Sequence, residues 1–154
     1  MSTRAIAYLK QKKIPFDVVK YDHEEKGAEF AAKAVGFALE ATIKTLVVDL
    51  GEKRRVLALV PGHRQVDLKK LARICGAKRA AMADRATAER ATGYLVGGIS
   101  PFAAKQRLSS VMEESLMACD HVLINAGQRG TMLEMAPADI AGVLECQMAS
   151  IISP

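Results

Sequence analysis

The stretch GYLVGGISPF, residues 93–102, places two adjacent glycines and a Ser-Pro pair at the end of an apolar run. Glycine weakens a strand and marks a bulge or a close backbone approach, and proline ends strand pairing. The stretch therefore predicts a strand that breaks into a rigid loop. In such a loop the amides of Gly97 and Gly98 can hold a carboxylate, an ester carbonyl or a phosphate without a reactive side chain. A plain tight turn is the alternative.

Lys44 is the second candidate for chemistry. It begins the apolar run KTLVV, and on a strand it shares one face with Leu46 and Val48 while Thr45 faces the other way. An ammonium on an apolar face either extends to water, finds a partner or serves as a binding charge in a pocket. Tyr21 ends a neighbouring predicted strand beside Asp22 and His23, and its alternative role is that of a half-buried core tyrosine.

The usual hydrolytic and metal-binding motifs are missing. Ser100 lacks the nucleophile-elbow pattern because Phe102 stands where the second glycine belongs. The three histidines are isolated, and no phosphate-binding glycine loop ends in Lys-Ser or Lys-Thr. The cysteines are odd in number and widely spaced, at 75, 119 and 146. We therefore expect no metal, no cofactor and no disulfide, and a reduced cytoplasmic protein with inert thiols.

Charge is distributed unevenly along the 154 residues, whose net charge is +5. Residues 53–90 carry eleven Lys or Arg against three Asp or Glu, whereas residues 111–154 carry one Arg against six acids. A basic middle segment favours a surface for a polyanion, and well-solvated helix faces are the alternative. No apolar run approaches a membrane span, and the N-terminus lacks a secretory pattern. We expect no membrane association.

The elements that must position these residues mix helices and strands without regular alternation. We predict one domain over residues 1–154, of mixed α/β class, with a curved, mostly antiparallel, barrel-like sheet flanked by helices. Helices are expected at 2–13, 28–37, 66–76, 84–93 and 136–148, and strands at 15–21, 43–50, 56–60, 78–83 and, as a hairpin, within 121–135.

Several of these segments together resemble the YbaK/EbsC family of aminoacyl-tRNA deacylases, related to the editing domain of bacterial prolyl-tRNA synthetases. The resemblance covers residues 4–150. It is carried by Tyr21-x-His23, Phe30, KTLVV at 44–48, VDLKKLA at 66–72, GAKRAAMAD at 76–84, TGYLVGGISPF at 92–102 and GQRG at 127–130.

The resemblance implies a barrel-like sheet with a cleft for the 3′ end of a charged tRNA, and removal of a mischarged amino acid, typically cysteine from the tRNA for proline. It implies no protein nucleophile, because the substrate's own thiol, or a water, cleaves the ester. It assigns catalytic roles to Lys44, Tyr21 and Gly97, and substrate contacts to Phe30, Thr45, Gly98, Ile99, Ser100, Pro101 and Asn125. The implied partners are the aminoacyl-tRNA and, in addition, prolyl-tRNA synthetase.

Three positions depart from the family pattern. Ala103 stands where relatives carry glycine, Asn125 where a serine is usual, and Met132 where an Asp or Gln is usual. Asparagine still donates and accepts hydrogen bonds, whereas methionine does little of either. These departures leave the released amino acid open.

Two other functions remain open at this point. The same cleft and basic segment would also suit a module that binds the tRNA 3′ end or a synthetase without turnover. A hydrolase of small esters is the third reading, and it predicts activity that is insensitive to salt, unlike binding to tRNA.

Overall fold

The structure is a computed structural model that describes residues 3–21, 32 and 36–154. The predicted helix at 28–37 lies largely outside the described residues. Along the chain the elements are α1 (Arg4–Gln11), β1 (Asp17–Lys20), η1 (Leu39–Ala41), β2 (Ile43–Gly51), β3 (Arg54–Pro61), α3 (Leu68–Ile74), β4 (Ala81–Met82), α4 (Arg85–Thr92), β5 (Ser109–Glu113), η2 (Glu114–Ala118), β6 (Val122–Gln128), β7 (Thr131–Met135), α5 (Pro137–Leu144) and β8 (Gln147–Ala149).

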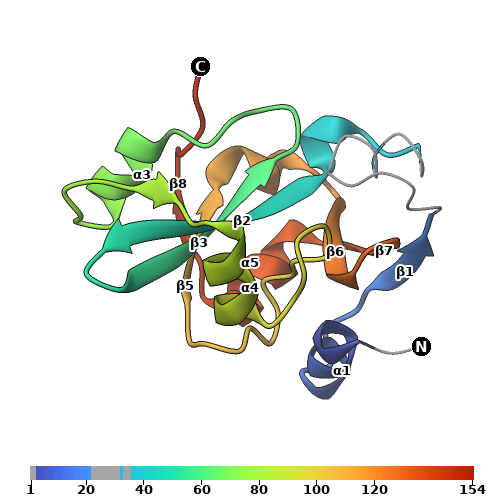
Figure 1. Ribbon diagram of the computed structural model, residues 1–154. Coiled ribbons are helices and arrows are strands. Elements are labelled where there is room, and N and C mark those ends of the chain that lie inside the picture. The colour runs from blue at the N-terminus through green and yellow to red at the C-terminus, as the bar shows by residue number, and fades with distance from the viewer. Residues whose placement is uncertain (1–2, 22–31, 33–35) are drawn as a thin grey trace.

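The described strands form two sheets. The larger has the order β4-β2-β3-β5-β8, and the smaller has the order β1-β7-β6 (Figure 1). Most strand pairs are antiparallel, but β3–β5 and β5–β8 are parallel. The mixed α/β class and the mostly antiparallel pairing are therefore as predicted. The prediction of a barrel-like sheet is wrong: among the described residues the backbone pairing between the two sheets is limited to one isolated bridge between Thr42 and Leu123, and neither sheet closes on itself.

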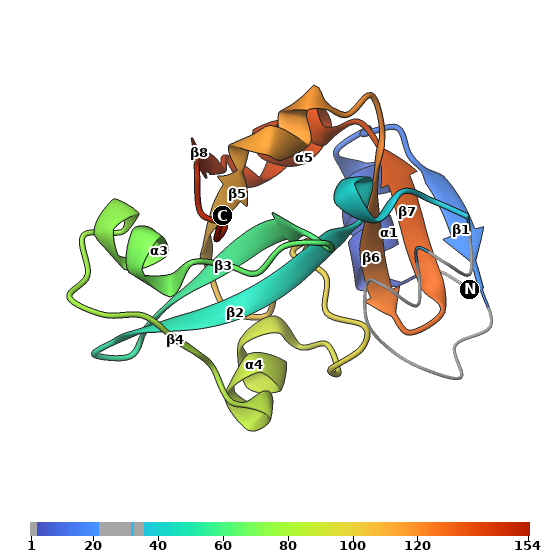
Figure 2. The same ribbon diagram turned by 90° about the horizontal axis from the view of Figure 1, so that it is seen from above.

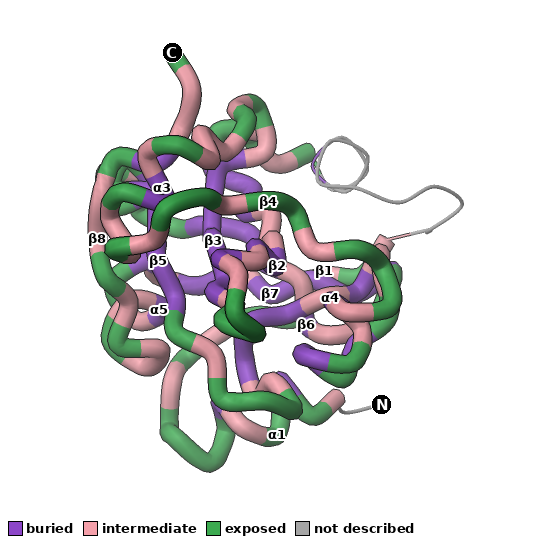
Figure 3. The backbone as a smooth tube through the Cα atoms, turned by 60° about the vertical axis from the view of Figure 1, so that its left-hand side comes forward, coloured by how far each residue is buried: buried purple, intermediate pink, exposed green. Residues whose placement is uncertain are grey.

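The β2–β3 hairpin separates two hydrophobic cores because its side chains alternate between the faces of the sheet. Val47, Leu57 and Leu59 pack on the side of α1, α5 and the smaller sheet. Val48, Ala58 and Val60 pack on the other side, against Leu71 of α3 and Ile151. In Figure 3 the central strands are accordingly buried while the outer surfaces of the helices are exposed. Figure 2 shows α3 and α4 on opposite sides of this hairpin.

Helices α3 and α4 begin and end where the sequence signals predict. Asp67 caps α3 by accepting a hydrogen bond from the Lys70 amide at 3.1 Å, and Asp84 caps α4 through the Thr87 amide at 2.7 Å. Gly93 ends α4 in the left-handed conformation, with φ of 80°. Among the described helices, none is long and apolar enough to cross a membrane.

Two strands of the larger sheet were absent from the prediction. β5 lies in a stretch to which the sequence assigned no element, and β8 overlaps the end of the predicted C-terminal helix, which instead ends at Leu144. Both strands pair in parallel with partners distant in sequence. Glu113 locks them together: its Oε1 accepts from the Ile151 amide at 2.9 Å and its Oε2 from the Ser115 amide at 2.8 Å. The hydrophobic periodicity within these two segments does not predict pairing between strands so far apart in the sequence.

Candidate functional site

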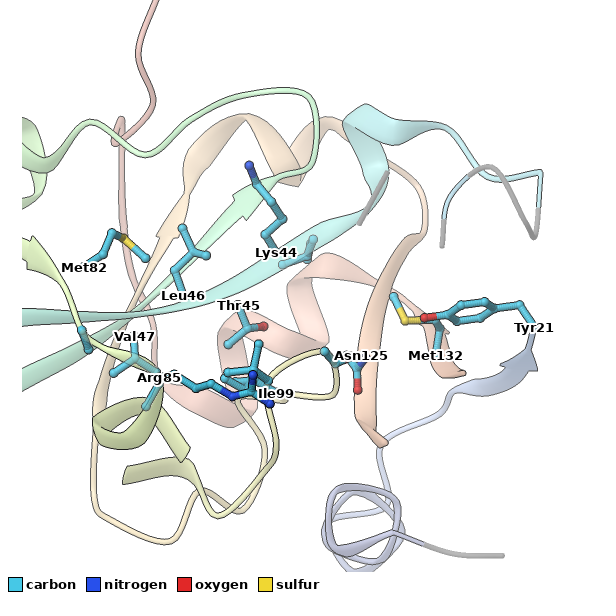
Figure 4. Close-up of a pocket in the computed structure, with 15 residues that line it drawn as sticks. Tyr21, Lys44, Thr45, Leu46, Val47, Met82, Arg85, Ile99, Asn125 and Met132 are labelled. Atoms are coloured by element: carbon cyan, nitrogen blue, oxygen red, sulfur yellow. Dashed lines mark hydrogen bonds between the residues drawn. The ribbon is translucent and has the colours of Figure 1, made fainter. Parts of the chain in front are cut away.

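A cavity of about 520 Å³ lies where the free edge of β2 faces the glycine loop and the smaller sheet (Figure 4). It is mainly apolar, and no carboxylate is among its described lining residues. The side chains and backbone that line it come from Tyr21, Ile43, Lys44, Thr45, Leu46, Val47, Met82, Ala83, Arg85, Ala88, Val96, Gly97, Ile99, Asn125 and Met132.

The edge of β2 supplies backbone hydrogen-bonding groups to this cavity. In the antiparallel pair with β3, the Thr42 carbonyl accepts from the Gly62 amide, whereas the Val47 carbonyl accepts from Ala83 on the opposite side. Alternate residues point in alternate directions, so Thr45 directs its N–H and C=O away from β3, as Val47 does. Within the described chain, β4 pairs only with Val48 and Asp49 of β2. The Thr45 backbone therefore faces an unpaired edge. Its Oγ1 is also buried without a hydrogen-bond partner.

Lys44 lies on the opposite face of β2 from Thr45, beside Leu46 (Figure 4). Its Nζ donates to the Arg64 carbonyl at 2.7 Å. Partial burial lowers the pKa of this amine from its ordinary value. An ammonium has three hydrogens, so the bond to Arg64 leaves two for a ligand at the cavity rim. The sequence left open whether this charge reaches water, a partner or a pocket. In the structure Lys44 lines the cavity and is held by the Arg64 carbonyl.

The glycine loop, residues 93–103, is fixed by its neighbours. Tyr94 closes its base with a hydrogen bond from Oη to the Phe102 carbonyl at 2.5 Å. Glu89 of α4 accepts from the Val96 amide at 2.7 Å, and the Gly97 carbonyl accepts from Asn125 Nδ2 at 3.3 Å. Gly97 itself has a φ of 97°, which favours glycine. Its amide has no internal acceptor in the described structure and is free to donate to a ligand.

The second half of the loop packs inward instead of facing the cavity. Gly98 donates its amide to the Leu95 carbonyl at 2.8 Å, and a Cβ there would lie 2.9 Å from the Arg129 nitrogen on the β6–β7 turn. Ser100 is fully buried and its Oγ accepts from the Phe102 amide at 3.3 Å. Pro101 is buried as well and lines a different cavity. Of the loop residues predicted to contact substrate, only Gly97 and Ile99 reach the cavity.

Tyr21, Asn125 and Met132 form the end of the cavity nearest the smaller sheet. Met132 is 3% exposed and packs with Tyr21, and Figure 4 shows the two side chains next to each other. Asn125 Oδ1 accepts from the amides of Gly127 and Gln128, at 2.7 and 3.1 Å. Most of the hydrogen-bonding groups of the Asn125 side chain are therefore already paired within the protein. Phe30 lies outside the described residues.

Several lining residues were not predicted as site residues. Arg85, in the first turn of α4, brings a cation to the cavity and lies 3.4 Å from Glu89 through its Nε. Met82, Ala83 and Ala88 come from the β4–α4 segment. The match of GAKRAAMAD at 76–84 to the family pattern could have indicated that the β4–α4 segment lines the site. For Leu46 and Val96 the sequence held no such signal.

The three cysteines lie away from this cavity and are partly exposed. Burial raises the pKa of each thiol, and that of Cys146 reaches about 11. A raised pKa keeps a thiol protonated and unreactive near neutral pH.

Comparison with known proteins identifies the family. The family model of the aminoacyl-tRNA editing domain matches residues 22–143. The Enterococcus faecalis protein named "Putative Cys-tRNA(Pro)/Cys-tRNA(Cys) deacylase EbsC" is 32% identical over 97% of this chain and 92% of its own length. The Escherichia coli K12 protein named "Multifunctional Ser/Thr-tRNA deacylase ProXp-y" is 30% identical over 96% of this chain and 90% of its own.

Solved structures agree with this assignment. One described as "Crystal structure of a putative trans-editing enzyme for prolyl tRNA synthetase" superposes with a TM-score of 0.90 at 25% identity, covering 100% of this chain and 99% of the other. Another, described as hypothetical protein APE2540, has a TM-score of 0.91 at 18% identity, over 98% and 100% of the two chains, and supports the fold alone.

Proposed function

The chain belongs to the aminoacyl-tRNA editing domain family, as a trans-editing deacylase of the YbaK/EbsC type, and from this premise we propose that it releases cysteine from the tRNA for proline. The observation that carries the proposal is the free Gly97 amide opposite the unpaired edge of β2 at Thr45. Together they form a slot that offers hydrogen bonds to an ester without presenting a protein nucleophile.

The Gly97 amide and the Thr45 backbone amide are proposed to polarise the ester carbonyl. Negative charge develops on that oxygen during attack, and fixed backbone donors stabilise it without reorganisation. The Thr45 carbonyl and its unpartnered Oγ1 accept from the α-amino group of the substrate. These acceptors are neutral, and no carboxylate is among the described residues that line the cavity.

Lys44 is proposed to hold the terminal nucleotide. Its ammonium stands on the other side of the β2 edge from Thr45, so it meets the ribose and phosphate while the ester lies in the slot. The Arg64 carbonyl fixes the direction of the ammonium, and two N–H donors remain for oxygen atoms of the substrate. Arg85 supplies a second cation to the cavity, on the Thr45 side of β2 (Figure 4).

The bond-breaking step uses the substrate's own thiol. The cysteine Sγ loses its proton and attacks the ester carbonyl carbon, the bond to the ribose oxygen breaks, and that oxygen takes up a proton through solvent. The amino acid leaves as a cyclic thioester, which water opens to free cysteine. The protein contributes position and carbonyl polarisation, which together account for large rate effects.

Met132 and Asn125 support cysteine over serine or threonine as the released residue. Met132 is apolar and Asn125 is occupied by Gly97, Gly127 and Gln128, so this end of the cavity offers few hydrogen bonds to a hydroxyl group. A thiol is a weak hydrogen-bonding group that packs well against methionine sulfur and an aromatic ring. A buried hydroxyl without partners is costly.

The test is a panel of charged tRNAs for proline that carry cysteine, serine, alanine or proline. The proposal predicts fast release of cysteine and slow release of the others. Release of serine at an equal or higher rate would contradict the assignment of cysteine as the substrate but would still support deacylase activity. Binding of all four with no release would support the non-catalytic module, which the same occupied Asn125 and apolar Met132 favour.

A further inference from the structure

A second cavity, of about 980 Å³, opens at the end of the larger sheet where β3 and β5 begin. Its lining is polar and strongly basic. Lys53, Arg54, Arg55 and Arg107 line it, and the single carboxylate among its described lining residues belongs to Glu145. The hydroxyls of Ser109 and Ser110 lie in the same wall. Four cations against one anion predict a site for a negatively charged ligand.

Arg55 carries the strongest evidence. Its Nε is buried without a hydrogen-bond partner, and no described side chain forms an ion pair with its guanidinium. A buried unsatisfied N–H is rare in folded proteins, and on a charged group it is costly. Planar guanidinium donors match the oxygen atoms of phosphate. An oxyanion in the cavity would satisfy this group.

Neither of the two described acids near Arg55 forms an ion pair with it. Asp49 faces it across the β2–β3 pair, but its Oδ1 accepts from the Gly51 amide at 2.8 Å. Asp84 caps α4; its pKa is lowered first by the Thr87 hydrogen bonds and then by Arg90 and Arg55. That carboxylate is fully exposed, so solvent screens its attraction to Arg55.

Strand pairing places the second cavity near the first. Asp49 pairs with Arg55 on one side and with Ala81 on the other, and Ala81 precedes Met82 of the first cavity. Asp49 is four positions beyond Thr45 on β2. Strand geometry therefore places Arg55 about 14 Å from Thr45, a span that a few nucleotides of a single strand can cover.

We propose that the second cavity binds backbone phosphates of the tRNA acceptor end whose terminal ester occupies the first cavity. The inference rests on the proposed function, because it takes the 3′ end to lie at Lys44 and Thr45. It adds a distinct surface: Arg55 and Arg107 hold the strand upstream of the ester and take no part in the chemistry. Sequence-independent phosphate contacts suit a protein that meets different tRNAs.

Arg55→Gln and Arg107→Gln test this surface, with Lys10→Gln on α1 as a control that removes an exposed charge lining neither cavity. The readout is kcat/KM on cysteinyl-tRNA and on cysteinyl-adenosine, which has the ester but no upstream phosphates. Each arginine variant should lose roughly tenfold on the tRNA and nothing on the small ester. Equal losses on both substrates would overturn the proposal, as would no loss on either.

Binding of uncharged tRNA tests the second cavity even if the protein does not catalyse the proposed deacylation. The slope of log affinity against log salt should become shallower by about one for each arginine removed, with Lys10→Gln unchanged. Inorganic phosphate should raise the melting temperature of wild type but not of Arg55→Gln. Stabilisation by phosphate that tRNA fails to compete away would overturn the tRNA assignment in favour of a small phosphate ligand.

Discussion

The side-chain amide of Asn125 ties the glycine loop to the β6–β7 hairpin, with Nδ2 3.3 Å from the Gly97 carbonyl oxygen. The Oδ1 of the same amide accepts from two amides of the turn that follows. Where the family pattern has serine, this chain thus has a clamp between two elements that are 28 residues apart. We propose that Asn125 acts on the reaction through Gly97, as a positioning residue, instead of contacting the substrate as the family resemblance implies.

Asn125→Asp isolates the donor half of this clamp. The carboxylate still accepts from the amides of Gly127 and Gln128 but repels the Gly97 carbonyl. The Gly97 peptide should therefore rotate, and its amide should no longer point into the cavity. We expect kcat to fall about tenfold with KM nearly unchanged, because the lost interaction is one made with the transition state. Gln128→Glu, the same chemical change on the same turn, should leave kcat unaltered. An equal effect of both variants on kcat would show that added charge, and not the clamp, is responsible.

Lys44 should impose an alkaline limit on activity. Burial lowers the pKa of its amine, so the ammonium loses its proton below the ordinary lysine value of about 10.4. Binding of a non-hydrolysable 3′-aminoacyl-amide analogue should weaken as pH rises through this pKa. A chemical-shift titration of the labelled lysine gives the pKa directly, and binding that stays constant through it would contradict the role of the charge.

The same pKa shift has a consequence for stability, with a definite sign. Above the folded-state pKa the unfolded chain binds more protons than the native state, so the free energy of unfolding rises with pH. This rise should be confined to the interval between the lowered pKa and the ordinary one, and Lys44→Met should abolish it. Chemical denaturation across this pH range, with wild type and Lys44→Met compared, is the measurement.

Gly98 is required for close approach of the loop to the β6–β7 turn, since a Cβ there would lie 2.9 Å from the backbone nitrogen of Arg129. Gly98→Ala should lower the free energy of unfolding by about 2 kcal/mol and displace Gly97 from the cavity. Gly142→Ala on α5 is the matched control, because a Cβ there meets nothing within 4 Å and alanine favours helix. If both substitutions proved equally tolerated, the loop would not be packed as described.

Ala103 occupies a backbone conformation that favours glycine. Its φ of 56° lies in the left-handed region, and Arg4 Nη2 fixes it by donating to its carbonyl at 2.8 Å. Ala103→Gly should therefore raise the free energy of unfolding by about 0.5 to 1 kcal/mol. Ala104→Gly, at a neighbouring residue without a positive φ, should be neutral or destabilising. Thermal denaturation that ranks the two variants the other way would contradict this account.

The sequence predicted what local signals determine. Caps at Asp67 and Asp84, the αL glycine at 93 and the apolar alternation of the β2–β3 hairpin all appear as expected. It missed β5 and β8, whose parallel pairing depends on partners far away in the chain. It also predicted a barrel where two separate sheets form, because strand patterns do not specify how a sheet closes.

For the candidate site, too, the sequence did not predict the features that depend on contacts between distant segments. The family resemblance assigned Tyr21, Lys44, Thr45 and Gly97 to one site, and in the structure all four line the first cavity. The inward packing of Gly98, Ser100 and Pro101 could not be read from the sequence, because it depends on the β6–β7 turn and on Phe102. The occupied state of Asn125 likewise depends on a carbonyl from another element.

The most direct test of the central claim is release of cysteine from charged tRNA for proline by wild type and by Lys44→Ala, measured side by side. Circular dichroism and the affinity for uncharged tRNA serve as controls for folding and for the distal phosphate contacts. We predict that wild type releases cysteine and that Lys44→Ala, folded, loses at least about a hundredfold in kcat/KM. A folded Lys44→Ala protein with full activity would contradict the assignment of this cavity as the deacylation site.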